Sequence, residues 1–146
     1  MTRNQFRTFI ETGANAIEPD VFFDTGRITD FNSIQDISYP YVWLVSPGTS
    51  PELNTNLLLF DNWGAEIHIG KQDKQDASNT ESEAIIDECD MIARKLIILL
   101  NQSIDSYATA TITSIGIQPF TKKHSRCESG VILSFTVNAP DTSNLC

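Results

Sequence analysis

A long, regularly spaced apolar pattern constrains the fold of this 146-residue chain more than any other feature. Apolar residues recur at alternating spacings of four and three, at Ile85, Cys89, Ile92, Leu96 and Leu99, and a second stripe runs beside them. That spacing is the period of an α-helix with one buried side. Ser78 and Thr80 each precede a glutamate by three residues, a pattern that caps helix N-termini. We therefore predict one helix over residues 79–104.

Two further apolar residues of this helix, Met91 and Ile98, lie off both stripes, so its C-terminal half is apolar almost all round. A helix that covers one face of a sheet has no need for this. Either the first helix of the chain covers the additional surface, or a neighbouring subunit does. We keep both alternatives and name Met91 and Ile98 as candidate subunit contacts.

The strands before the long helix differ in how they are covered. Residues 41–46 form a continuous β-branched and aromatic run, which is typical of a central strand covered on both faces. The short apolar stretch 57–60 is followed by residues 61–64, which we expect to form a turn. Apolar and polar residues then alternate over residues 65–70, as in a half-buried strand.

After the long helix, the apolar pattern returns to a period of two. One predicted strand has Thr111, Thr113, Ile115 and Ile117 on a single face, and the next has Val131, Leu133, Phe135 and Val137. They predict a hairpin over residues 109–138 with a long tip at residues 120–129. The tip holds three of the ten basic residues, Lys122, Lys123 and Arg126. It is either a solvated turn or an interaction arm that meets an acidic patch on the next copy of this chain.

The N-terminal region, residues 1–38, has a weaker pattern. Phe6, Phe9 and Ile10 predict a helix over residues 2–14 that Gly13 ends. Residues 15–38 are expected to be irregular, with loops and room for short strands. Residues 39–146 hold the sheet, the long helix and the hairpin. We predict a single α+β domain over residues 1–146, with a mainly antiparallel sheet of four to five strands and one long and one short helix on one face.

Charge and composition exclude several classes of protein. Nineteen acidic against ten basic residues give a formal charge of −9, which disfavours binding to nucleic-acid backbones or anionic membranes. The longest apolar run, residues 96–100, is too short for a membrane span, and the N-terminus lacks the apolar core of a secretory signal. We therefore expect a protein that stays in the cell that makes it. Cys89, Cys127 and Cys146 follow no motif spacing and are expected to be free thiols.

Patterns that carry chemistry are largely missing from the sequence. It contains no Gly-x-Ser-x-Gly elbow and no glycine-rich phosphate loop. The two histidines are His68, on a predicted strand, and His124, whose H-x-x-C spacing to Cys127 lies among basic residues that would repel a cation. We expect no catalytic, cofactor or metal site and no enzymatic activity. A pocket that brings one of these histidines to a carboxylate would favour an enzyme instead.

Several stretches resemble a known family. They are residues 39–47 (YPYVWLVSP), residues 65–73 (AEIHIGKQD) ahead of 83–90 (EAIIDECD), and residues 130–137 (GVILSFTV) before the terminal Cys146. In element order and texture, residues 39–146 resemble small virion proteins of tailed phages of the Bacteroidetes. The greatest similarity is to tail terminator or tail-completion proteins of the head-to-tail neck.

This resemblance implies a structural virion protein, assembled in the cytoplasm of the host bacterium. Its partners would be copies of itself in a ring, typically a hexamer, together with the tail tube protein and the neck or connector proteins. The ring would cap the tail tube and let DNA pass through its hole without specific binding. The alternative that the charge favours is an acidic, monomeric binding module, such as an immunity protein or a DNA mimic, with one basic partner.

Overall fold

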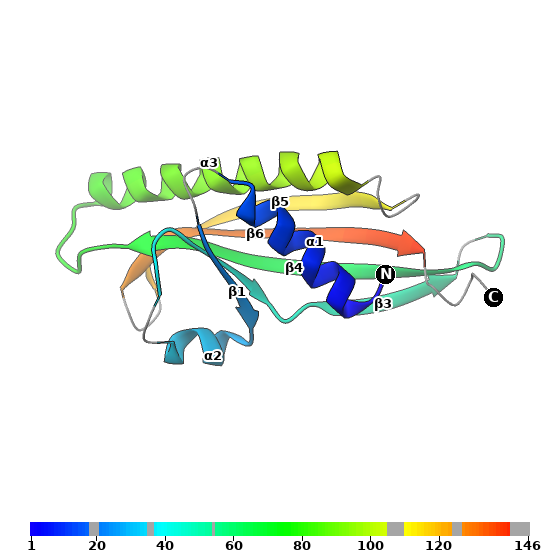
Figure 1. Cartoon of the computed structure of the whole chain (residues 1–146). Coiled ribbons are helices and arrows are strands. Elements are labelled where there is room, and N and C mark those ends of the chain that lie inside the picture. The colour runs from blue at the N-terminus through cyan, green and yellow to red at the C-terminus, as the bar shows by residue number, and fades with distance from the viewer. Residues whose placement is uncertain (18–20, 35–36, 54, 105–109, 124–126, 141–146) are drawn as a thin grey trace.

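A curved six-stranded sheet with helices on both faces forms the computed structural model, which describes residues 1–17, 21–34, 37–53, 55–104, 110–123 and 127–140 (Figure 1). The strands are β1 (Phe22–Gly26), β2 (Tyr41–Val45), β3 (Gly48–Leu53), β4 (Leu59–Gln72), β5 (Thr111–Lys123) and β6 (Glu128–Pro140). The helices are α1 (Arg3–Asn15), α2 (Ile28–Ser33) and α3 (Asn79–Ser103). This confirms the predicted single α+β domain, with six strands where four to five were expected.

The sheet is built around β4, which is its longest strand. The strand order is β1-β2-β4-β6-β5. One edge of β4 pairs with two strands, with β3 along its first half and with β2 along its second half. All pairs are antiparallel except β1 with β2. The predicted central strand at residues 41–46 is therefore β2, with both faces buried as expected, but β4 holds the central position because β2 lies one strand nearer the edge.

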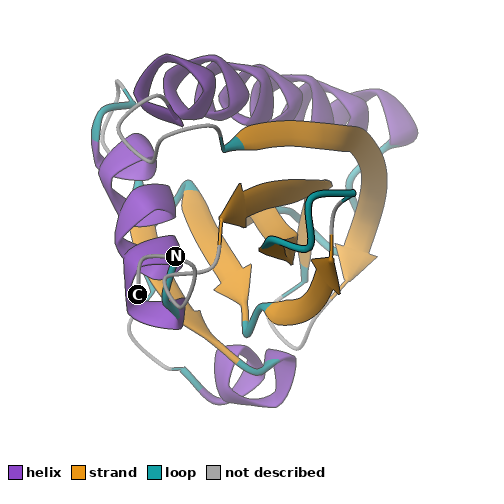
Figure 2. Cartoon of the chain, turned by 90° about the vertical axis from the view of Figure 1, so that its right-hand side faces the viewer, coloured by secondary structure: helices purple, strands orange, loops and turns teal. Residues whose placement is uncertain are grey.

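Helix α3 confirms the helix predicted over residues 79–104. Ser78 is the N-cap, and its hydroxyl accepts a hydrogen bond from the backbone N–H of Glu81 at 3.3 Å. The buried side of α3 includes Cys89, Ile92 and Leu96, which pack on the apolar side chains of β4 and β6. Figure 2 shows the strands curving beneath α3 and α1, with α2 on the opposite side.

Helix α1 runs on past the glycine that was expected to end it. Gly13 lies inside α1 and faces α3, where an added Cβ would come within 2.7 Å of Cδ2 of Leu100. The residue therefore allows close approach of the two helices. Phe6, Phe9 and Ile10 are buried as predicted, and the Phe6 ring stacks on Trp63 of β4 at 5.3 Å between centroids.

The segment predicted to be irregular, residues 15–38, instead contains β1 and α2. Strand β1 lies where loops with room for short strands were expected, but its parallel place beside β2 was not predicted, and its burial is only intermediate throughout. Helix α2 buries Phe31 against Tyr41 and Trp43, which point to the face of β2 away from α1 and α3. A second, smaller core thus lies on the other face of the sheet.

Residues 61–64, expected to form a turn, are in fact in the middle of a continuous β4. They pair with β3 on one edge and with β6 on the other, and this double pairing overrides their turn-forming composition. The turn precedes β4, at residues 55–57.

The C-terminal hairpin is longer than residues 109–138, and its predicted strand faces are only half correct. Val131, Leu133, Phe135 and Val137 all enter the core as expected. In β5, a register shift after Thr113 contains Ser114, with φ of 57°, and Ile115, which stays exposed. Ile117, beyond the shift, packs on the core as expected, whereas before the shift it is Ile112 that does so. Such a bulge adds a residue to one strand and so reverses the alternation of its faces.

The tip of this hairpin is also shorter than the predicted residues 120–129. Pairing continues from Phe120 opposite Gly130 to Lys123 opposite Glu128, through a second register shift. Glu128 and Ser129 are buried, although the sequence placed them in an exposed turn. This end of the hairpin lies against the loop that precedes α3, where the Ser129 hydroxyl donates to Asp73 and the carbonyl oxygen of Cys127 accepts from the backbone N–H of Asp73.

Candidate assembly sites

The outer side of α3 carries two large exposed apolar side chains. Met91 and Ile98, both proposed as subunit contacts, expose 59% and 57% of their surfaces. They are two helical turns apart and therefore lie on one line along the helix. Helix α1 covers the side of α3 that holds Leu96 and Leu100, so it accounts for part of the apolar excess, and Met91 and Ile98 remain outside this contact.

The β3–β4 hairpin forms a second apolar surface, which sequence reasoning missed. This hairpin, residues 48–64, is named here the leucine arm, and it projects beyond the helices at one end of the molecule (Figure 1). Leu53 and Leu57 near its tip expose 60% and 78% of their surfaces, and Leu58 is exposed as well. Leu57 also has φ of 60°, a left-handed conformation that leucine adopts at a cost. The turn-forming residues 54–56 between two apolar groups were the signal that could have revealed this hairpin.

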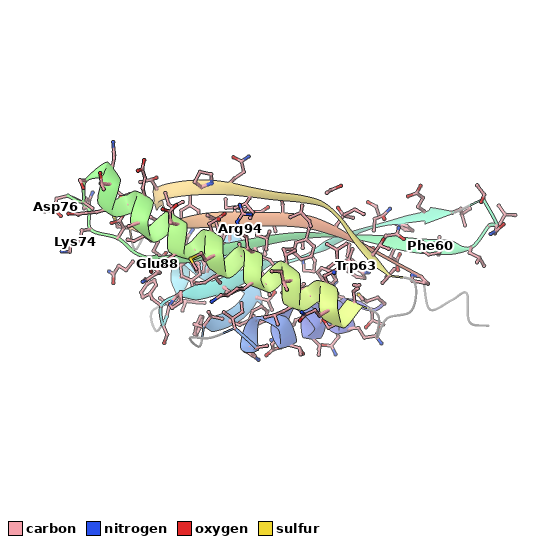
Figure 3. All side chains as sticks on the ribbon, turned by 90° about the horizontal axis from the view of Figure 1, so that it is seen from above. Phe60, Trp63, Lys74, Asp76, Glu88 and Arg94 are labelled. Atoms are coloured by element: carbon pink, nitrogen blue, oxygen red, sulfur yellow. The ribbon has the colours of Figure 1, made fainter. Side chains whose placement is uncertain are left out.

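A pocket lies at the opposite end of the molecule, where the N-terminus of α3 meets the end of β5. It is named here the end pocket and has a volume of about 430 Å³. It is lined by Asn79, Ser82, Glu83, Ile86, Pro119, Phe120 and Thr121. Figure 3 shows the two ends in one view, with Lys74 and Asp76 labelled beside the start of α3 and Phe60 labelled on the leucine arm.

Of the three predicted basic contact residues, Lys122 directly follows Thr121, which lines the end pocket. Lys122 donates from Nζ to the carbonyl oxygen of Ala77 at 2.8 Å and from its backbone N–H to Oγ of Ser129 at 2.9 Å. The ammonium group is therefore held against the loop before α3. The side chain of Lys123 and the whole of Arg126 and His124 fall outside the described residues, so the contacts predicted for Lys123 and Arg126 stay predictions.

Asp73 fastens three segments together at the same end. Its Oδ2 atom accepts hydrogen bonds from the hydroxyls of Ser82 in α3 and Ser129 in β6, each at 2.6 Å. Its Oδ1 atom accepts one from the backbone N–H of Lys74 at 2.8 Å. Burial raises the pKa of the Asp73 carboxyl, but these hydrogen bonds and the nearby charge of Lys122 outweigh it and hold the pKa below its ordinary value. The carboxylate thus has a structural role that explains its burial.

His68 meets a carboxylate, the arrangement that would favour an enzyme. Its Nε2 atom lies 2.7 Å from Oε1 of Glu66, at the border of a cleft of about 690 Å³ that Arg27 and Ser46 also line. The histidine exposes only 3% of its surface, whereas Glu66 is half exposed. A general base must reach the proton that it removes, and this imidazole has almost no exposed surface through which to do so.

Other chemical groups of the described residues offer little support for a reactive site. No group of three or more His, Cys, Asp or Glu side chains in the described ranges is placed to hold a metal ion. Cys89 and Cys127 are free thiols, and burial raises the pKa of the Cys89 thiol to about 12, which keeps it protonated and unreactive. None of the described helices is long and apolar enough to cross a membrane.

In comparisons with known proteins, no family model matches this sequence, and no curated protein is significantly similar to it.

Proposed function

We propose that this protein is a non-catalytic structural subunit that works by assembling with copies of itself into a ring. The observation that carries the proposal is the exposure of large apolar side chains on two separate surfaces, the leucine arm and the outer side of α3. Apolar residues gathered in this way mark interaction sites on soluble proteins. A ring requires two different surfaces on each subunit, because its contacts are head to tail.

The specific role that we propose is the one that the sequence resemblance implies. A hexameric ring would cap the tail tube of a tailed phage and join it to the head connector, as part of the virion. The formal charge of −9 fits a ring with a central hole, since an acidic wall repels the DNA backbone and so does not trap DNA in transit. No cofactor or metal takes part in this function.

A non-catalytic role is favoured by the burial and the hydrogen bonding of the described side chains that could act as acids, bases or nucleophiles. The described histidine is buried and engaged with Glu66, the Cys89 thiol is buried, and Asp73 is held by two serine hydroxyls. Each of these groups is satisfied by the fold itself. A catalytic group needs access to its substrate, and its position is usually explained poorly by folding alone.

The mass of the purified protein in solution tests this proposal. We expect a single species with the mass of several chains, measured by sedimentation or native mass spectrometry, and we expect that species to bind isolated tail tubes. A protein that stays monomeric at all accessible concentrations, with and without tail tubes, would contradict the proposal.

The competing proposal is an acidic, monomeric module that binds one basic protein. One observation favours it, because the first half of α3 exposes four acidic side chains, Glu81, Glu83, Asp87 and Glu88. Such a face would attract a basic partner and speed its association. A one-to-one complex with a basic protein, formed by a chain that does not self-associate, would support this alternative over the ring.

A further inference from the structure

We propose that the leucine arm of one copy docks in the end pocket of the next copy, so that assembly is head to tail. This inference rests on the proposed function and names the contact through which the ring would form. It begins with the position of the two surfaces at opposite ends of an elongated molecule (Figures 1 and 3). An arm in this position has no access to the pocket of its own chain, and its partner must be a second molecule.

The leucine arm exposes apolar side chains, which is unfavourable for a monomer and is relieved when a partner covers them. Leu57 places an apolar side chain in water at the tip of a turn and in a left-handed backbone conformation, where glycine or asparagine would be cheaper. Leu53 and Leu58 add apolar surface beside it. None of these three side chains belongs to either core, and each exposes 45% or more of its surface.

The end pocket offers the matching chemistry. Ile86, Pro119 and Phe120 supply apolar surface, and Asn79 and Thr121 add uncharged polar groups. A hydrophobic anchor that enters a pocket with such a rim is the usual centre of a protein interface. One wall of the pocket is tied down, because Asp73 accepts hydrogen bonds from Ser82, which lines the pocket, and from Ser129 of β6.

Charge also favours contact at these two places. Two copies of a chain with a formal charge of −9 repel each other over most of their surfaces. The stretch Leu53–Phe60 carries no charged residue, and Glu83 is the one charged side chain among those that line the pocket. The uncharged tip of the arm would therefore meet the acids at the start of α3, including Glu83, without placing further acids opposite them.

Strand pairing between copies is a poorer explanation of the arm. The outer strand of the arm, β3, includes Pro51, which has no N–H to donate, and β5 at the other edge of the sheet is interrupted by two register shifts. Prolines and bulges are devices that prevent edge strands from pairing with another chain. Side-chain docking in a pocket does not depend on these edges.

Two complementary variants test the docking. The arm variant carries Leu53→Ser, Leu57→Ser and Leu58→Ser and keeps its pocket, whereas the pocket variant carries Thr121→Trp and keeps its arm. Thr121 is an exposed residue of an edge strand, so an indole there crowds the pocket without entering the core. Each variant alone is expected to self-associate about 10- to 100-fold more weakly than the natural chain, from the loss of buried leucine surface.

The decisive result is obtained from the mixture. Equal amounts of the two variants should form a species of two chains and no larger one, because only one arm and one pocket remain intact in each pair. Thr55→Ser in the arm and Thr121→Ser in the pocket are matched controls that should assemble like the natural chain. Circular dichroism and thermal melts would check that each variant is folded.

Three outcomes would overturn the inference. The arm variant would assemble like the natural chain, the mixture would show no two-chain species at concentrations where the natural chain assembles, or the arm variant would assemble but fail to bind tail tubes. The last outcome assigns the arm to the tube protein. In all three the proposed ring function survives, whereas a natural chain that never self-associates removes the function and the docking together.

Discussion

Replacement of Asp73 by alanine tests whether one buried carboxylate holds the pocket end of the molecule together. The substitution leaves the hydroxyls of Ser82 and Ser129 without the acceptor that both use at 2.6 Å. It also removes the acceptor of the Lys74 backbone N–H. Three segments, namely the loop before α3, the start of α3 and the start of β6, would lose their common attachment point.

The size of the effect follows from the number and type of bonds lost. A hydrogen bond to a charged group contributes about 1.5–3 kcal/mol, and the contributions are not additive because the freed hydroxyls can turn to other partners. Oγ of Ser129 also keeps the hydrogen bond that it accepts from the backbone N–H of Lys122. We therefore expect Asp73→Ala to lower the free energy of unfolding by about 3 kcal/mol, which corresponds to about 6–12 °C in Tm for a domain of this size.

Thermal unfolding followed by circular dichroism measures this effect, with Asp76→Ala as the matched control. Asp76 lies three residues away on the same loop and is exposed, so its loss should change the free energy of unfolding by less than about 0.5 kcal/mol. Ser82→Ala and Ser129→Ala should each cost less than Asp73→Ala, and either one combined with Asp73→Ala should add little. Equal Tm values for the Asp73 and Asp76 variants would refute the reasoning.

The pH dependence of the same pair of proteins gives an independent check. The pKa of Asp73 is lower in the folded chain than its ordinary value of 3.8, so the unfolded state binds the proton more readily. The stabilisation by Asp73 is therefore fully present above the unfolded pKa and is lost as pH falls through the folded pKa. The Tm difference between the natural chain and Asp73→Ala should be constant from neutral pH to about pH 5 and should shrink below pH 3.8. A difference that grows as the pH falls would contradict the assigned direction.

Three further predictions concern assembly and packing. Replacement of Met91 and Ile98 by glutamine should weaken self-association, measured by sedimentation, while leaving Tm nearly unchanged, because both side chains are exposed in the single chain; an unchanged association constant would remove the outer side of α3 from the interface. Replacement of Lys122, Lys123 and Arg126 near the hairpin tip by glutamate should also weaken self-association. Unchanged self-association would indicate that the hairpin tip makes no subunit contact. Gly13→Val should lower the free energy of unfolding by about 1–3 kcal/mol in denaturant titrations, because its Cβ would press on Leu100, and a stabilised variant would contradict the close approach of α1 and α3.

The parts of the fold that were predictable are those with a strong local period. Helix α3 has a cap and an uninterrupted apolar stripe, and β6 alternates cleanly because one of its faces is in the core and no bulge interrupts it. β5 was half predictable, because Ser114 interrupts its alternation in a left-handed conformation that leaves no trace in the apolar pattern. For β1 the sequence indicated only a segment of loops with room for short strands, since its parallel pairing depends on β2, which lies further along the chain.

The candidate surfaces were likewise predictable where a local sequence period defines them and not predictable where contacts between distant residues form them. Met91 and Ile98 were found because helical period alone places them off the buried stripe, and their exposure agrees with that placement. The leucine arm was missed because residues 61–64 have the composition of a turn but are fixed as a strand by β3 and β6 together. The end pocket had no local signal, because Ile86 and Phe120 approach each other only in the folded chain.

The anchoring of the leucine arm in the sheet affects the expected affinity of self-association. An association that must first order a flexible segment loses part of its binding free energy to that ordering. The first half of β4 is paired with β3 on one edge and with β6 on the other, up to Phe60 opposite Pro140, so its base is fixed within the sheet. The pocket is fixed in turn by Asp73. If both partners are ordered before they meet, weakening one anchor should weaken assembly even where no contact residue is changed. Asp73→Ala, which leaves every side chain of the arm in place, should therefore reduce self-association as well as Tm at temperatures where the variant is still folded.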